Sequence, residues 1–347
     1  MNRFDRQIRV PAIGKNGQEK MMSSTVLLVG CGALGSYCAE QLVRGGIKKL
    51  ILVDFDHVEV SNLQRQALFV HEDAQNKTKK VIAAKKQLSR IDPTVEIIAY
   101  AEHFEQTIFR SLDSLDLILD CTDNFATREV INSYAYQQNI PFIFAACSQT
   151  VGQLMAIVPR KKPCLHCLFP NADILGEKAC DIQGILTPLI PLVTSLQISL
   201  AYKILIGDPS ISWETFYFVD IWDCSFQSFH VSKNKECPYC SSSTATSTQL
   251  SELKKVCGTD VYQGKYPVSM APILIADCKN HQGKIIQHPM GVLLIWDTIQ
   301  LTLFKNGTML IYGLKEKPDK DAFPQFFQSL QKGRKHIDCQ YNHFNNQ

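Results

Sequence analysis

The sequence predicts an α/β protein built on a Rossmann-like, mostly parallel sheet covered by helices. One observation is the alternation of short apolar segments with amphipathic ones between Thr25 and about Phe144, which is typical of a parallel sheet that is buried on both faces. Another is the stretch "VLLVGCGALGS", where an apolar segment runs into a Gly-x-Gly-x-x-Gly turn. Turns of this kind join a strand to the helix that follows it.

The expected elements follow one another along the chain. Strands are expected at residues 25–30, 49–56, 94–100, 115–123 and 140–147. The helices between them are expected at 35–46, which ends in two glycines, and at 79–91, which stops before Pro93. Two further strands and a buried apolar helix continue the same unit, at 152–159, at 215–222 and within 184–202.

A Ser/Thr-rich run, "SSSTATSTQLS", has the composition of a linker. It divides the chain into a large unit, the linker itself and a small appended α+β segment, at 1–240, 241–251 and 252–347. In the last part, residues 299–313 predict a β-hairpin with Asn306-Gly307 at its turn. Residues 320–333 predict a closing helix.

Composition excludes several classes of protein. The net charge of +3 gives no reason to expect a nucleic-acid or membrane partner. The uncharged stretch at 184–202 contains two prolines and several polar residues, so we expect a helix inside the protein rather than a membrane span. The first residues lack an apolar signal region, and the 13 cysteines suit a reducing compartment. The expected location is the cytoplasm.

The glycine turn predicts a nucleotide site. Gly30, Gly32 and Gly35 would let the backbone approach a phosphate, which the N-terminus of the following helix would attract. Asp54 ends the second expected strand, where an acidic side chain can hold a ribose hydroxyl. These features suit NAD and an adenine mononucleotide equally well.

The segment "DFDHVEVSNLQRQ" and its neighbours favour a nucleoside triphosphate over NAD. Its Asn62 and Arg65 offer polar and cationic contacts to phosphate. Lys80 opens the next helix, and Asp123 lies at the C-terminal end of the fourth strand, where its carboxylate would suit Mg²⁺. Three arginines, Arg3, Arg6 and Arg9, precede the first strand. We expect the whole set to converge on one end of one sheet.

Two Cys-x-x-Cys pairs predict a structural zinc site. The four cysteines are Cys164, Cys167, Cys237 and Cys240. The pairs are too far apart for a zinc finger, so only the fold would bring them together as a closed set of four thiolates. Such an ion would pin the C-terminal part of the sheet, residues 150–236. Two separate reducing or buried pairs are the alternative, and His166, inside the first pair, is not expected to be a ligand.

Taken together, these motifs resemble the ThiF/MoeB/HesA family of adenylyltransferases, relatives of the ubiquitin-activating enzymes. The motifs are "RFDRQI", "VGCGALGS", "VDFDHVEVSNLQRQ", "LDCTDN" followed by Arg128, and "CDIQGILTPLI". The resemblance covers essentially the whole chain, including "VCGTDVYQ" and "LTLFKNG" in the appended segment. The pairing of "SNLQRQ" with "CTDN" is far more specific than the glycine turn alone.

The resemblance implies a role for each matching residue. The residues expected to hold the adenosine and its phosphates are Gly30, Gly32, Gly35 and Asp54. Those expected to contact the triphosphate are Asn62, Arg65 and Lys80, with Lys79 as an alternative to Lys80. Asp123 would bind or position Mg²⁺, and Arg6 would reach into the site of a partner subunit, which implies a homodimer.

The implied reaction uses ATP to adenylate the C-terminal glycine of a small ubiquitin-like sulfur-carrier protein that ends in Gly-Gly. Cys180 stands where some family members form a covalent bond to the carrier, and an unreactive loop thiol is the alternative. No rhodanese-type loop is evident in residues 252–347, so sulfur would come from a separate cysteine desulfurase or rhodanese-type protein. Thiamine and molybdopterin synthesis both stay open as the pathway.

Three other functions compete with this one. A related enzyme could adenylate a tRNA base or a peptide C-terminus. An NAD-dependent dehydrogenase would leave "SNLQRQ", Lys80 and the cysteine pairs unexplained. A non-catalytic module that binds a ubiquitin-like protein would not need the phosphate-binding residues.

Overall fold

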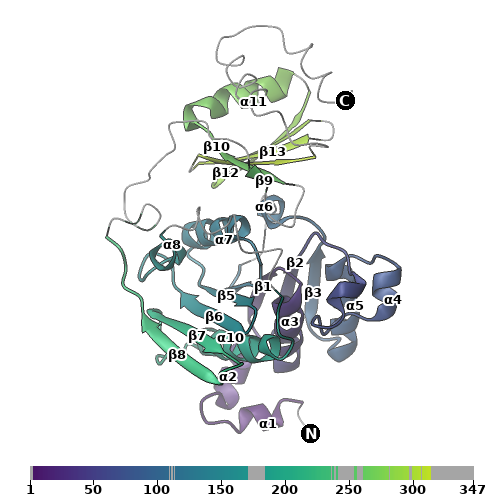
Figure 1. Ribbon diagram of the computed structural model, residues 1–347, viewed down its shortest axis with the longest axis vertical. Helices are drawn as coiled ribbons and strands as arrows, with labels where there is room; N and C mark the ends of the chain where they lie inside the picture. Colours follow the sequence, from purple (N-terminus) through teal and green to yellow (C-terminus); the bar gives the residue numbers. More distant parts are fainter. Residues whose placement is uncertain are drawn as a thin grey trace. The chain divides into compact units, whose positions relative to one another are not determined.

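The chain divides into two units, Met1–Ser243 and Thr244–Gln347, both drawn in Figure 1. The computed structural model describes residues 3–108, 110, 112, 114–170, 184–235, 237, 240, 254–255, 261–280, 282–296, 299–305 and 307–313. Cys180, the expected linker at 241–251 and the expected closing helix at 320–333 lie outside these residues.

The first unit is organised around an eight-stranded sheet of order β3-β2-β1-β4-β5-β6-β7-β8. Its parallel strands are β1 (Thr25–Val29), β2 (Lys49–Val53), β3 (Glu96–Tyr100), β4 (Leu117–Asp120) and β5 (Phe142–Ser148). The strands added in antiparallel fashion are β6 (Val151–Ile157), β7 (Thr215–Asp220) and β8 (Ser225–His230). The mostly parallel sheet is therefore confirmed.

Every residue of β1, β2 and β4 is buried, because helices cover both faces of the parallel strands. One face carries α2 (Gly14–Met21), α3 (Ala33–Gly45), α5 (Lys80–Ile91) and α10 (Leu189–Ile206). The other carries α6 (Phe104–Thr107) and α7 (Phe125–Gln138). The short helix α8 (Leu165–Leu168) is hydrogen-bonded to α7. Figure 1 shows α7 and α10 on opposite sides of β5 and β6. The shorter elements are α1 (Asp5–Ile8), α4 (His71–Gln75) and the 3₁₀ turn η1 (Val60–Asn62).

Helix α10 is long and apolar enough to cross a membrane by length and composition. Its packing is that of a core helix, because it contacts α2, α3 and the strands β4, β5 and β6. Gln197 on this helix is fully buried and donates to the backbone oxygens of Asp120 (3.2 Å) and Ile143 (3.3 Å). The interior position expected from the sequence therefore agrees with the structure.

The second unit is a six-stranded antiparallel sheet of order β11-β12-β13-β14-β10-β9. Its elements are β9 (Lys254–Lys255), β10 (Tyr262–Lys265), η2 (Val268–Met270), α11 (Ala271–Asn280), β11 (Lys284–His288), β12 (Gly291–Trp296), β13 (Ile299–Phe304) and β14 (Thr308–Tyr312). The expected hairpin is β13 with β14. Leu274 of α11 packs with Leu294 and Leu303 of the sheet in a separate hydrophobic core.

Candidate functional site

The candidate site lies at the carboxyl edge of the parallel strands. Gly30 follows β1, Asp54 follows β2 and Asp123 follows β4 closely. Because these strands are parallel neighbours, the loops after them meet at one edge, which is where open α/β sheets bind their ligands.

The glycine turn is closely packed at two of its glycines and open at the third. Gly30 has a positive φ of 89°, and a Cβ there would lie 2.7 Å from the backbone oxygen of Cys121. A Cβ on Gly35 would lie 1.9 Å from the oxygen of Gly30. At Gly32, the N-cap of α3, the nearest atom would be the amide nitrogen of Gln66 at 3.8 Å. The room for a phosphate is therefore in front of Gly32, at the N-terminus of α3.

Asp54 is tied to the glycine turn. Its Oδ2 accepts the backbone N–H of Cys31 at 2.7 Å, and its Oδ1 accepts that of Asp56 at 2.8 Å. Burial raises the pKa of the Asp54 carboxyl, although the Lys80 ammonium opposes the shift. Each carboxylate oxygen can accept more than one hydrogen bond, so both contacts are compatible with a further bond to a ribose hydroxyl.

Lys80 faces a group of carboxylates at the start of α5. Its Nζ lies 2.8 Å from Oδ2 of Asp56. Burial alone would lower the pKa of Lys80, but Asp54 and Asp56, with a smaller contribution from Asp123, raise it above its ordinary value. Lys79 instead donates to the backbone oxygen of Phe55 at 2.6 Å. Of the two lysines, Lys80 is therefore the one that the fold directs to the acidic groups.

The "SNLQRQ" segment forms η1 and the turn after it. Asn62 is buried; its Oδ1 accepts the backbone N–H of Glu59 at 3.1 Å, and its amide nitrogen donates to the hydroxyl of Ser61 at 3.5 Å. The amide nitrogen carries two N–H groups, so it can also donate to a ligand. Arg65 is half-buried and donates to the backbone oxygen of Ser61 at 2.9 Å. That bond uses one of its guanidinium nitrogens and leaves others to bind an anion.

Sequence reasoning did not select three residues that the structure places at this edge. Asp56 holds Lys80, and Gln66 is buried beside Gly32 with an Oε1 that has no hydrogen-bond partner among the described residues. His103, after β3, stacks on Phe55, after β2, with ring centres 3.8 Å apart. Burial lowers the pKa of His103 to about 4. Asp56 and Gln66 could have been selected from the sequence, because they are the second acid of "DFD" and the second glutamine of "SNLQRQ". The stack of His103 on Phe55 has no signal in the local sequence, because the two residues are far apart along the chain.

The N-terminal arginines do not share this edge within one chain. Phe4 packs against Gly46 and Gln7 donates to the oxygen of Gly45, at the end of α3 away from the glycine turn. Arg3 pairs with Asp92 at 3.2 Å, at the end of α5. The expectation that these arginines converge with the other site residues is therefore wrong for a single chain, because α3 and α5 run from the carboxyl edge to the opposite one. Arg6 is exposed at that opposite edge.

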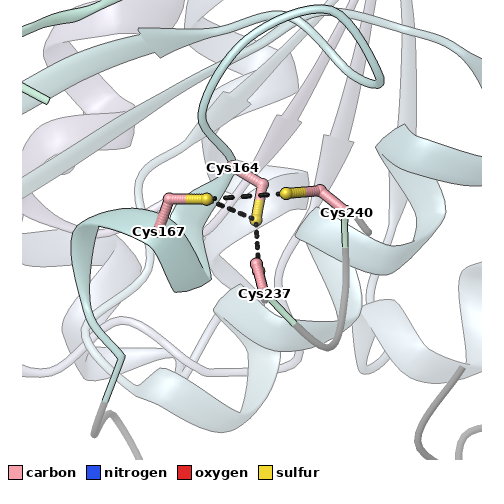
Figure 2. A group of neighbouring side chains, drawn as sticks. All are labelled: Cys164, Cys167, Cys237 and Cys240. Carbon is pink, nitrogen blue, oxygen red and sulfur yellow. Dashed lines mark hydrogen bonds between the residues drawn. The ribbon is translucent and has the colours of Figure 1, made fainter. Parts of the chain in front are cut away.

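The four expected cysteines meet in space, as Figure 2 shows. The Sγ of Cys164 lies 3.9 Å from that of Cys167 and 3.6 Å from that of Cys237, and the Sγ atoms of Cys167 and Cys240 are 3.5 Å apart. A tetrahedral ion with Zn–S distances of about 2.3 Å would separate its ligands by about 3.8 Å. These three distances are close to that value, and all four sulfurs lie within 4.8 Å of one another, so the group could hold a zinc ion.

Helix α7 supports the cysteine cluster. The side-chain oxygen of Asn132 accepts the backbone N–H of Leu165 at 3.2 Å. The Nε2 of His166 lies 3.7 Å from a carboxylate oxygen of Glu129 on α7, outside the group of four sulfurs.

Cys147 is on β5, partly buried against the core of the first unit.

Several known proteins are similar to this chain over most of its length. The model of the ThiF family matches residues 4–239. The chain is 30% identical over 327 residues to the sulfur carrier protein ThiS adenylyltransferase of Bacillus subtilis (strain 168), covering 90% of this chain and 95% of that protein. It is 34% identical over 244 residues to the molybdopterin-synthase adenylyltransferase of Escherichia coli (strain K12), covering 69% and 96%.

A solved structure shares the fold. The crystal structure of E. coli MccB with ATP superposes with a TM-score of 0.60 at 20% identity, and the match covers 69% of this chain and 74% of that one. At this identity the likeness concerns the architecture alone.

Proposed function

The chain belongs to the ThiF family and is an adenylyltransferase, and we propose that it adenylates the C-terminal glycine carboxylate of a small ubiquitin-like sulfur-carrier protein. The observation that carries the proposal is the carboxyl edge, where the open glycine of the turn, Asp54, Lys80 and Asp123 lie on neighbouring loops. The relatives named above act on sulfur carriers or on molybdopterin synthase by name, and one of them matches 90% of this chain.

In the proposed reaction, a carboxylate oxygen of the carrier attacks the α-phosphorus of ATP. An O–P bond forms, and the bond from the α-phosphorus to the bridging oxygen breaks. Pyrophosphate leaves with the electron pair, and an acyl-adenylate remains. The carboxylate is already ionised at pH 7, so the step depends on orientation and on neutralising phosphate charge rather than on a general base.

Each site residue has a part in that charge balance. The turn at Gly30, Gly32 and Gly35 lets the phosphates approach the N-terminus of α3. Asp54 receives the ribose, and Asn62, Arg65 and Lys80 bind the triphosphate. The raised pKa of Lys80 keeps its ammonium charged at neutral pH.

The proposal extends to a homodimer. Arg6 is exposed at the edge of the sheet away from the glycine turn, so it does not serve the site of its own chain. In a homodimer, Arg6 of a second copy would add a cation to the phosphates.

Two metal ions are part of the proposal. Asp123 supplies an oxygen ligand of the kind that Mg²⁺ prefers, and Mg²⁺ would offset the charge of the triphosphate. The cysteine cluster would hold a structural Zn²⁺, since all four ligand positions are protein sulfurs and none is left for substrate.

The carrier's pathway, thiamine or molybdopterin synthesis, follows from which carrier is accepted. Sulfur would come from a separate cysteine desulfurase or rhodanese-type protein, in the cytoplasm. Cys180 would either form a covalent bond to the carrier or take no part. A covalent carrier adduct that forms on the unmodified chain and is lost in a Cys180→Ala variant would show the first.

ATP–pyrophosphate exchange, with and without carrier proteins that end in Gly-Gly, tests the proposal. Exchange is expected only with a carrier. Arg65→Ala, Lys80→Ala and Asp123→Ala should each lose one charged contact, about 1.5–3 kcal/mol or roughly 10- to 100-fold in rate. Lys79→Ala is the matched control for Lys80→Ala, because Lys79 bonds a backbone oxygen instead, and it should stay within about 3-fold.

Absence of exchange with every carrier, while ATP still binds, would contradict the proposal. A different adenylyl acceptor, such as a peptide C-terminus, would then take the place of the carrier. Binding of NADH in preference to ATP with Mg²⁺ would point to a dehydrogenase instead.

A further inference from the structure

Arg128 is a buried arginine on the first turns of α7, shortly after the loop that carries Asp123. It is 6% exposed. Its guanidinium carbon lies 5.2 Å from the ring centre of Phe125 and 5.0 Å from that of Phe144. Burial and these two rings restrict access to the cation. It is therefore poorly placed to bind a phosphate that enters from solvent.

The hydrogen bonds of Arg128 join the loop to the neighbouring strand β5. One Nη2 donates to the backbone oxygen of Thr122 and, at 3.5 Å, to that of Ala145 on β5. The backbone N–H and the hydroxyl of Thr122 donate to Oδ1 of Asp120 at 3.0 and 2.7 Å. Every polar group of Thr122 is therefore bonded, and the next residue is Asp123.

The charge of Arg128 faces Asp120. The Nε lies 3.6 Å from Oδ2 of Asp120, whose side chain is fully buried. Burial raises the pKa of the Asp120 carboxyl, and Arg128 opposes that shift. A buried carboxylate is costly without a compensating charge, so removing Arg128 alone would disturb Asp120 as well as Thr122.

The loop is also packed on its other side. A Cβ on Gly30 would lie 2.7 Å from the oxygen of Cys121 and 3.1 Å from the nitrogen of Thr122. The loop between β4 and α7 is therefore clamped between the glycine turn and Arg128. Of its two further residues, Asn124 is the N-cap of α7, and Asp123 is exposed and interacts electrostatically with Lys80.

We propose that Arg128 is a positioning residue: it fixes the Thr122 carbonyl so that the carboxylate of Asp123 is held at the carboxyl edge of the parallel strands, facing Lys80. It touches neither nucleotide nor metal and acts through Thr122. This inference rests on the proposed function, because it takes Asp123 to be the residue that binds Mg²⁺ with ATP.

The first experiment needs no ligand. Amide hydrogen exchange is measured across residues 118–126 in the full chain and in a double variant, Arg128→Met with Asp120→Asn. The double variant removes both members of the ion pair and keeps the Oδ1 acceptor for Thr122, so the fold should survive. Exchange at Thr122 and Asp123 should become about 10-fold faster. The amides of β5 should change by less than about 2-fold.

The second experiment measures how Mg²⁺ affects ATP binding. In the double variant, the Mg²⁺ concentration for half-maximal ATP binding should rise about 10-fold, as is usual when the support of a metal ligand is lost. ATP affinity in EDTA should stay within about 2-fold. The single variant Arg128→Lys can still donate to Thr122. Its amide exchange and its Mg²⁺ requirement should therefore both stay close to those of the unmodified chain.

Arg160→Met is the matched control. Arg160 also lies over an aromatic ring, that of Tyr136 at 5.2 Å, and donates to a backbone oxygen, but it is on the surface away from the loop. It should leave both measurements unchanged.

Three outcomes would overturn the proposal. Unchanged exchange at Thr122 and Asp123 in the double variant would show that Arg128 does not order the loop. An unchanged Mg²⁺ requirement would separate the loop from metal binding. An equal loss of ATP affinity with and without Mg²⁺ would mean that Arg128 binds the nucleotide directly. Failure of the unmodified chain to bind ATP would instead count against the proposed function, and hydrogen exchange would still decide whether Arg128 orders the loop.

Discussion

The glycine turn and the cysteine cluster are both compact sites, but they are built in opposite ways. The turn between Gly30 and Gly35 is continuous in sequence, and its shape comes from backbone atoms that pack closer than any side chain allows. The cluster joins Cys164 and Cys167 to Cys237 and Cys240, which are far apart in sequence and meet only through the fold.

The two sites are therefore stabilised for different reasons. The turn requires residues without a side chain, since a Cβ on Gly35 would fall 1.9 Å from a backbone oxygen. The cluster would depend on a bound cation, because three of its sulfur pairs lie only 3.5–3.9 Å apart, an arrangement that is favourable mainly around such an ion. The turn should therefore tolerate loss of metal, and the cluster should tolerate changes at the turn.

Removing one sulfur should have the largest effect. Cys237→Ser, or chelation of the metal, is expected to destabilise the first unit by about 3–5 kcal/mol, a part of the roughly 10–16 kcal/mol that zinc contributes in zinc-finger peptides. Zinc content and thermal unfolding measure the two effects together. Cys224→Ser, at an exposed cysteine outside the cluster, is the control. Full stability of a zinc-free chain would show that the cluster is not structural.

The two glycines at the ends of α3's first turn should respond differently to the same substitution. Gly35→Ala places a Cβ against the Gly30 backbone and should cost about 1–3 kcal/mol of stability and most of the nucleotide affinity. Gly32→Ala has ordinary contacts only, so its stability should stay within about 0.5 kcal/mol while phosphate binding weakens. Chemical denaturation and ATP binding distinguish them. Equal stability losses would contradict the assignment of the open space to Gly32.

Lowering the pH should have the smallest effect on folding stability, through His103 at the carboxyl edge of the parallel strands. With a pKa of about 4, His103 is neutral in the folded protein where the unfolded chain would protonate it. Between pH 6.5 and about 4 the unfolded state then binds more protons, so stability falls as pH falls.

The variant His103→Phe keeps the stack on Phe55 and removes the titration. From pH 7 to pH 5 it should lose about 1–2 kcal/mol less than the unmodified chain. Because both chains carry the same cysteine cluster, any acid release of metal cancels in the comparison. Parallel pH profiles would contradict the shifted pKa.

Much of the first unit could be predicted from the sequence because its signals are local. Strands buried on both faces are mostly apolar, and this pattern placed β1, β2 and β4 despite the charged residues Lys49 and Asp120 at two of their ends. Close backbone packing admits only glycine, which marked Gly30 and Gly35. Two Cys-x-x-Cys pairs in one chain are a specific metal-binding pattern, which predicted that Cys164, Cys167, Cys237 and Cys240 meet in space.

The tertiary structure alone decided what depends on contacts between distant segments. It directed Lys80 rather than Lys79 to Asp56, because the turn of α5 and the end of β2 are neighbours only in the fold. It placed the N-terminal segment that carries Arg6 at the edge of the sheet opposite the glycine turn. Helix α3 runs from the turn to that edge, and Phe4 packs against Gly46 at its C-terminal end. It also enclosed Arg128 with Asp120, because burial of a charge is a property of the packed core and leaves no mark in a local pattern.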